Sequence, residues 1–154
     1  MSSSYFFSSR AELDAAISAW IDNESAATET YGDINAWDVS DITDFSYLFE
    51  DSIKFNSEIS GWDVSNGTNF SSMFQGASSF NQAIDNWDVS NGTNFSGMFW
   101  GASSFNQDLN NWDVGNGKYF FSMFRDALSF NQNIGIWDVG SAISFSNMFN
   151  GASD

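Results

Sequence analysis

Residues 62–86 are WDVSNGTNFSSMFQGASSFNQAIDN, and residues 87–111 repeat this stretch with few changes. The string Trp-Asp-Val recurs at a constant interval of 25 residues, beginning at Trp37, Trp62, Trp87, Trp112 and Trp137. A unit this short cannot bury its own aromatic side chains, whereas stacked copies can cover one another. The sequence therefore predicts an array of stacked 25-residue repeats.

Two periodicities alternate within each repeat. From Trp62 to Ser65, large apolar and small polar residues alternate, which is typical of a half-buried strand. Further on, apolar residues at spacings of three and four indicate one face of a short helix. They are Phe70, Met73, Phe74 and Ala77, with equivalents within 95–102, 120–127 and 145–152. We predict an α/β repeat solenoid in which each unit adds a strand to a parallel sheet and a short helix that covers the sheet.

The first 36 residues lack the repeat and are predicted to form a cap. An apolar stripe at helical spacing comprises Leu13, Ala16, Ile17, Trp20 and Ile21. Ser9 and Glu12 form a capping box at the start of this helix. We therefore divide the chain into an N-terminal cap at residues 1–36 and a solenoid of five repeats at residues 37–154, with the fifth repeat incomplete.

Composition restricts the function. The chain has no Cys, His or Pro, so it lacks thiolate metal sites, the usual zinc ligand and the most common general base. Its net charge of −16, with four cationic residues, disfavours nucleic acids and anionic membranes as partners. No apolar run approaches the roughly 18 residues of a membrane span. The first ten residues show no signal-peptide pattern.

We predict that the protein is not an enzyme and has no resident cofactor. Phosphate-binding loops, serine nucleophile elbows and the HExxH motif are all absent from the sequence. Those motifs would supply the phosphate cradle, the activated nucleophile or the metal that the common hydrolases and transferases need.

One aspartate follows each repeated tryptophan. The row comprises Asp38, Asp63, Asp88, Asp113 and Asp138. Carboxylates stacked about 5 Å apart repel by roughly 1 kcal/mol per pair, so something must offset their charge. Either each carboxylate accepts hydrogen bonds from its own turn, or the row binds calcium weakly. A glycosidase-like pair is disfavoured because an acid and a base need different environments, and these positions are equivalent.

Three aromatic residues depart from the repeat. Trp100 stands where other repeats carry polar or charged residues, Tyr119 replaces asparagine, and Phe121 replaces serine. The helical pattern places Trp100 and Phe121 on one side of adjacent repeats. An exposed aromatic patch of this kind is typical of recognition sites, although drift of a tolerant surface explains the substitutions equally well.

Asparagines form a second repeated polar row. The row comprises Asn56, Asn81, Asn106 and Asn131. We expect their side chains to face inward, where their amides would satisfy the backbone of the neighbouring turn.

The sequence WDVSNGTNFSSMFQGASSFNQ, with its lead-in ELDAAISAWIDN and YGDINAWDVS, resembles the repeat domain of BspA-like surface proteins, also described as mycoplasma-type lipoprotein repeats. The resemblance covers nearly the whole chain. It implies a distant relation to leucine-rich repeats, an extracellular or cell-surface location, and a role in adhesion. The chain departs from the family pattern at Gly67, Gly92 and Gly117, where valine is expected, and at Phe70 and Phe95, where methionine is usual.

The leading hypothesis is a non-catalytic repeat scaffold that presents a binding or adhesion surface to a protein or glycan ligand. The alternative is a structural spacer, or a unit that associates with itself through an open C-terminal end. The fifth repeat stops before its Phe-Asn segment, so its apolar residues would have a neighbour on one side only. They are Trp137, Val139, Phe145, Met148 and Phe149. Either the chain is cut from a longer array, or this edge pairs with another molecule, for example in a two-fold end-to-end homodimer.

The acidity predicts that stability depends on salt. Because the net negative charge repels itself, added NaCl should screen the repulsion and raise the melting temperature above its value at low ionic strength. The measurement is thermal unfolding in NaCl, MgCl2 and CaCl2. A large shift with millimolar calcium that magnesium does not match would favour the calcium hypothesis, whereas no response to any salt would contradict the electrostatic argument.

Overall fold

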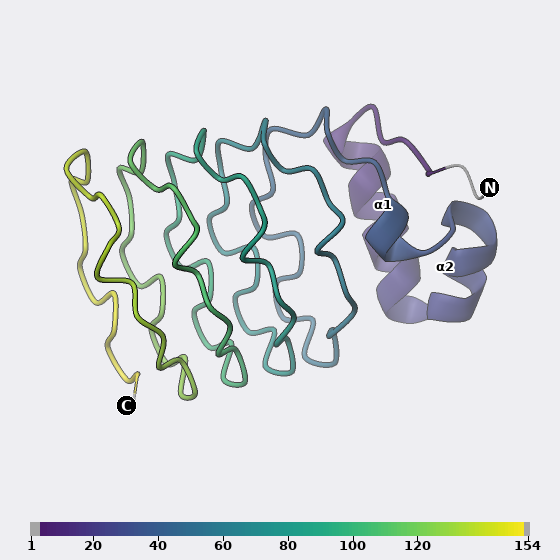
Figure 1. Ribbon diagram of the computed structural model, residues 1–154. Coiled ribbons are helices and arrows are strands. Elements are labelled where there is room, and N and C mark those ends of the chain that lie inside the picture. The colour runs from purple at the N-terminus through teal and green to yellow at the C-terminus, as the bar shows by residue number, and fades with distance from the viewer. Residues whose placement is uncertain (1–3, 153–154) are drawn as a thin grey trace.

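The computed structural model describes residues 4–152, which form two helices followed by a stack of irregular coils (Figure 1). Helix α1 (Arg10–Asp22) and helix α2 (Glu24–Tyr31) are followed by a short 3-10 helix, η1 (Ile34–Ala36). Each coil is one 25-residue repeat beginning at its tryptophan. Residues 1–3 of the predicted cap and residues 153–154 of the fifth repeat lie outside the described residues.

The predicted α/β solenoid with a parallel sheet is wrong. Between residues 37 and 152 the structure contains no α-helix and no strand, only isolated parallel bridges. In the coils these bridges join Asp44 to Asn69, Asn69 to Asn94, Asn94 to Tyr119 and Tyr119 to Ser144. Without strands, the leucine-rich-repeat-like character implied by the resemblance is not supported.

Backbone hydrogen bonding explains why the segment with helical spacing is not a helix. In the second coil the N–H groups of Met73, Gln75 and Ala77 donate to carbonyls three residues earlier, at 3.1–3.3 Å, as in turns. The N–H groups between them donate to the next coil at 2.7–2.9 Å. These pairs are Phe70 to Asn94, Ser72 to Ser96, Phe74 to Met98 and Gly76 to Trp100. An α-helix would instead send every N–H group to the carbonyl four residues earlier.

Left-handed residues spaced four apart keep the chain in turns. In the second coil they are Ser72, with φ of 55°, and Gly76, with φ of 70°. The same two positions have positive φ in every other coil: Tyr47 and Asp51, Gly97 and Gly101, Ser122 and Asp126, and Asn147 and Gly151. Because a left-handed residue interrupts a right-handed helix, the apolar spacing of three and four arises from successive four-residue turns.

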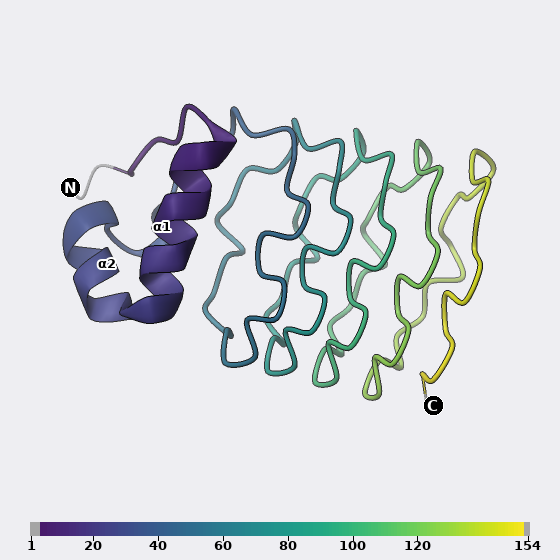
Figure 2. The same cartoon turned by 180° about the vertical axis from the view of Figure 1, so that it is seen from behind.

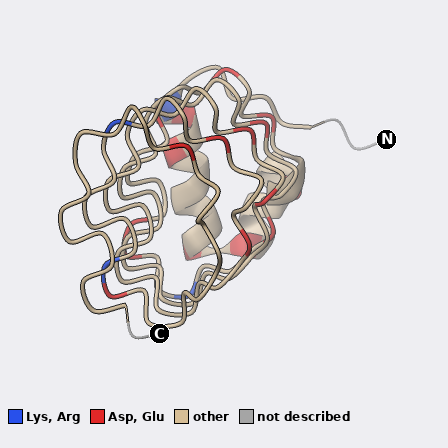
Figure 3. Ribbon diagram, turned by 60° about the vertical axis from the view of Figure 1, so that its left-hand side comes forward, with Lys and Arg blue, Asp and Glu red and all other residues tan. Residues whose placement is uncertain are grey.

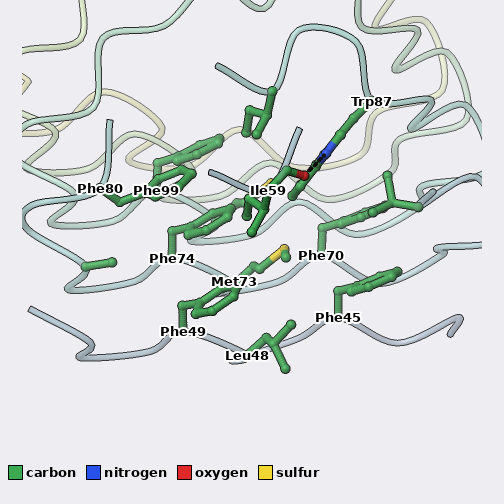
Figure 4. Close-up of a cluster of buried hydrophobic side chains, with 14 of the residues drawn as sticks. Phe45, Leu48, Phe49, Ile59, Phe70, Met73, Phe74, Phe80, Trp87 and Phe99 are labelled. Carbon is green, nitrogen blue, oxygen red and sulfur yellow. Dashed lines mark hydrogen bonds between the residues drawn. The ribbon is translucent and has the colours of Figure 1, made fainter. Parts of the chain in front are cut away.

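Aromatic rings stack along the core in the register of the repeat. One ladder comprises Phe45, Phe70, Phe95, Phe120 and Phe145, with ring centroids 5.4–5.6 Å apart and planes within 14° of parallel. A second ladder comprises Phe49, Phe74, Phe99, Phe124 and Phe149, also at 5.4–5.6 Å. Figure 4 shows Phe49 and Phe74 one above the other, beside the pair Phe45 and Phe70. Such offset parallel stacking is favourable beyond the burial of apolar area.

The predicted burial of the repeated tryptophans is confirmed, since their exposed fractions lie between 1 and 9 %. From the second coil on, each indole N–H donates to a carbonyl 28 residues earlier at 2.7–3.1 Å. In Figure 4 this bond joins Trp87 to Ile59. Each tryptophan therefore fills the core and ties its coil to the preceding one.

Packing explains the glycines that depart from the family pattern. A Cβ on Gly92 would collide with the ring of Phe95 and lie 2.9 Å from the carbonyl oxygen of Val89. The equivalent phenylalanine blocks the same space at Gly67 and Gly117. The two departures are therefore coupled: phenylalanine occupies the space that a larger residue three positions earlier would need.

The N-terminal helix closes one end of the stack (Figure 2). The hydroxyl of Ser9 accepts from the backbone N–H of Glu12, and α1 buries four of the five predicted stripe residues, leaving Ile21 exposed. The guanidinium of Arg10 donates to the carbonyl oxygens of Asp44, at 2.9 Å, and Ser46, at 2.6 Å. These carbonyls form the free edge of the first coil, so α1 satisfies acceptors that a preceding coil would otherwise bond.

Replacing Trp87 with Ala should lower the free energy of unfolding by about 3–5 kcal/mol, because it leaves a cavity in the aromatic core and removes the bond to Ile59. The measurement is urea unfolding of the variant and the parent. Ile136→Ala, at an exposed apolar residue, is the control and should change stability by less than about 0.5 kcal/mol. A loss below about 1 kcal/mol for Trp87→Ala would contradict the proposed core.

Candidate binding surface

Tyr119 and Phe121 lie on the outer surface of the fourth coil, with 42 and 46 % of their area exposed. Between them Phe120 is fully buried in the first aromatic ladder. The chain here alternates between core and solvent, as residues 69–70 and 94–95 also do. Other coils place asparagine or serine at the two outer positions, so the aromatic side chains are additions to a backbone that does not need them.

Trp100 belongs to the third coil and is partly buried against the fourth. The guanidinium carbon of Arg125 lies 4.8 Å from the centroid of the Trp100 ring, a cation–π contact. The indole N–H donates to Oδ2 of Asp126 at 3.3 Å, and Arg125 Nε lies 3.5 Å from the same oxygen. The three side chains thus hold one another across two coils.

The structure joins Trp100 to Phe121 through the backbone around Gly97. The Gly97 N–H donates to the carbonyl of Phe121 at 2.9 Å, and the Trp100 N–H donates to the carbonyl of Gly97 at 3.0 Å. No ring contact links Trp100 to Tyr119 or Phe121 among the described residues. The three residues therefore line one region, which we call the aromatic patch, without forming one stacked cluster.

Sequence comparison missed the partners of Trp100, which are Arg125 and Asp126. The signal was available, because Arg125 follows Trp100 by 25 residues and so occupies the same position in the next coil. Side chains at equivalent positions of adjacent coils are neighbours throughout this stack, as the aromatic ladders show.

The aspartate row is bonded within its own turns. In each coil the carboxylate Oδ1 accepts the backbone N–H two residues later, at 2.9–3.1 Å. In the first three coils it also accepts a serine hydroxyl at 2.6–2.7 Å. These bonds support the turn-forming role of Asp38, Asp63, Asp88, Asp113 and Asp138. The calcium hypothesis stays a prediction, and residues 4–152 contain no group of three or more acidic side chains placed to hold a metal ion.

Hydrogen bonding shifts the acidity of one member of this row. The Ser90 hydroxyl, followed by the Ser90 backbone N–H, lowers the pKa of Asp88 from its ordinary value of 3.8, against a small opposing effect of desolvation. Both donors stabilise the ionised carboxylate. Acidic segments recur along the outside of the stack, whereas cationic ones are few (Figure 3).

The predicted inward orientation of the asparagine row is wrong, because these residues are exposed. Their oxygens nevertheless satisfy the neighbouring coil as expected: Oδ1 of Asn56, Asn81 and Asn106 accepts the backbone N–H of the asparagine 25 residues later at 2.9 Å. Glutamine amides one position further on donate to the backbone carbonyls of the same asparagines at 2.9–3.2 Å. The row therefore fastens the coils from outside.

Two hollows lie at the ends of the stack. One, of about 610 Å³, lies between α2 and the first coil and has a mainly polar lining that includes Glu24, Asp33 and Lys54. The other, of about 580 Å³, lies on the last coil and is lined by apolar residues that include Trp137, Val139, Phe145, Met148 and Phe149. The second hollow contains the apolar residues that the sequence predicted at the open end.

Comparison with known proteins gives one family. The family model described as "Mycoplasma protein of unknown function, DUF285" matches the chain twice, over residues 22–116 and 68–154. No curated protein and no solved structure matches the chain. Within residues 4–152, neither α1 nor α2 has the length and apolar character that crossing a membrane requires.

Replacing Ser90 with Gly should raise the pKa of Asp88 toward 3.8, because the variant loses the hydroxyl that contributes most to the shift. A lowered folded-state pKa stabilises the fold above the unfolded pKa, and this stabilisation disappears as the pH falls through the folded pKa. The variant should therefore lose less stability than the parent on acidification. Carboxyl ¹³C NMR titration measures the pKa, with Ser104→Gly as the control, and an unchanged Asp88 pKa in Ser90→Gly would contradict the assignment.

Proposed function

We propose that the chain, which belongs to DUF285, a family of mycoplasma proteins of unknown function, acts as a non-catalytic scaffold that presents a binding surface. The repeat-containing domain supplies the scaffold. The finer part of the proposal is the aromatic patch of Trp100, Tyr119 and Phe121 as the contact surface, with a protein or a glycan as the ligand.

The observation that carries this proposal is the exposure of Tyr119 and Phe121 on either side of a fully buried phenylalanine. The backbone at both positions bonds the adjacent coil in the same way when the residue is asparagine or serine. Packing of the stack therefore does not require aromatic rings there. Exposed aromatic side chains beside an arginine are the residue types that most often dominate binding energies.

The ligand would meet a surface of mixed character. Tyr119 and Phe121 offer apolar ring faces, and the Arg125–Asp126 pair beside Trp100 offers a donor and an acceptor. Ring faces with nearby polar groups suit either a sugar ring or a protein segment. The resemblance to BspA-like proteins supports placing this contact outside the cell or at its surface, in a role such as adhesion.

A structural role is the second candidate, because one observation favours it. Phe145 and Phe149 of the last coil are 43 and 48 % exposed, whereas their counterparts Phe120 and Phe124 are fully buried. Burying this face would stabilise the end of the stack. A spacer or a unit of a larger assembly would use that face and would have no need of the aromatic patch.

The test replaces the patch residues with those that other coils carry, which preserves the scaffold. Tyr119→Asn and Phe121→Ser should leave the melting temperature nearly unchanged and weaken binding to any ligand found on glycan and protein arrays by about tenfold or more. Ile136→Asn, which also restores a residue of other coils at an exposed apolar position, is the control. Full binding by both patch variants, or no ligand on either array, would contradict this surface and favour the structural role.

A further inference from the structure

We propose that the face of the last coil binds one further coil of this repeat type, offered by that coil's carbonyl edge, and does not pair with the same face of a second copy. The inference concerns a surface separate from the aromatic patch. It rests on the direction of the hydrogen bonds, on the aromatic ladders and on the closed N-terminal end.

The last coil presents a row of backbone donors. In the first four coils, N–H groups at four positions two residues apart donate to the next coil. In the fifth coil these positions are Phe145, Asn147, Phe149 and Gly151, whose N–H groups have no acceptor among residues 4–152. The intervening carbonyls, from Ser144 to Asn150, are already bonded to the fourth coil. This edge therefore offers donors at two-residue spacing, and the one carbonyl that faces outward with them is that of Ile143, by equivalence with Lys118.

This polarity selects the partner. Two copies of the same face would oppose N–H to N–H, so the two-fold end-to-end homodimer suggested by the sequence would leave both rows of donors unsatisfied. An ordinary strand alternates N–H and C=O along its edge and satisfies only part of the row. A coil of this repeat offers matching carbonyls at two-residue spacing, as Tyr119, Phe121, Met123 and Arg125 do for the third coil.

The side chains on the face fit the same partner. Phe145 and Phe149 are the last rings of two ladders whose members are stacked 5.4–5.6 Å apart, and an added coil would continue both. The carbonyl of Ile134 stands where that of Leu109 stands one coil earlier, and Leu109 accepts an indole N–H from Trp137 at 3.0 Å. The next tryptophan in register would therefore find its acceptor at Ile134.

The N-terminal end shows why a second folded copy is not the occupant. The only carbonyl edge that a copy could offer is that of its first coil. There Arg10 occupies the carbonyls of Asp44 and Ser46, and α1 covers the end of the core. Head-to-tail pairing of whole chains would have to displace α1. The remaining occupant is a coil whose carbonyl edge is uncovered.

The test extends the full chain after residue 154 with a second copy of residues 130–152, which completes the fifth coil and adds a sixth. Amide hydrogen exchange by NMR should then slow at least tenfold at Phe145, Asn147 and Phe149, approaching the protection of Phe120, Ser122 and Phe124. The control extension has the same length, with the copies of Trp137, Phe145, Met148 and Phe149 replaced by serine, and should give no such protection.

Two outcomes would overturn the proposal. The first is equal exchange at residues 145–149 in the parent and the extended chain, or equal slowing by the serine control. The second is a dimer of the unextended chain in sedimentation equilibrium that slows exchange at these same amides, since the proposal expects a monomer. Protection with the intact extension alone, together with a monomeric parent, supports it.

Discussion

The stack depends on one hydrogen bond, the one that every second backbone N–H group along the turn-rich wall of a coil donates to the next coil. Because the bond recurs at four positions per coil, it fixes the register at 25 residues and places equivalent residues directly beside one another. The phenylalanine ladders follow from that register, since rings at the same position can only stack. Burial of these rings then supplies the apolar driving force that a single repeat lacks.

This bond also divides the residues by role. Positions that face the core are occupied by Trp, Val, Phe and Met in nearly every coil, whereas outer positions change freely because the backbone alone makes the cross-coil bond. Tyr119 and Phe121 are such outer positions, which is why the aromatic patch can exist without disturbing the stack. The same bond gives the stack a direction, with acceptors exposed at one end, where Arg10 closes them, and donors at the other.

The sequence was sufficient for the period and for much of the core, but it misled on secondary structure. Burial of Trp87 and the Phe70 ladder followed from recurrence alone. The helix at residues 70–77 was wrong because Ser72, unlike Gly76, gives no sign of a left-handed backbone, and two such residues turn helical spacing into successive turns. At the candidate site, comparison of repeats found Tyr119 and Phe121 as exposed departures. It did not find the contact of Trp100 with Arg125, because that contact crosses between coils and needed the stacking to be known.

The most direct test of the cross-coil bond is the measurement of NMR scalar couplings across hydrogen bonds, from backbone nitrogen to carbonyl carbon, in the third coil. The structure predicts couplings from Phe95 to Tyr119, from Gly97 to Phe121 and from Phe99 to Met123, each linking residues 24 apart. Couplings from Phe99 to Phe95, or from other residues of this segment to carbonyls four residues earlier, would show a helix there and would contradict the account.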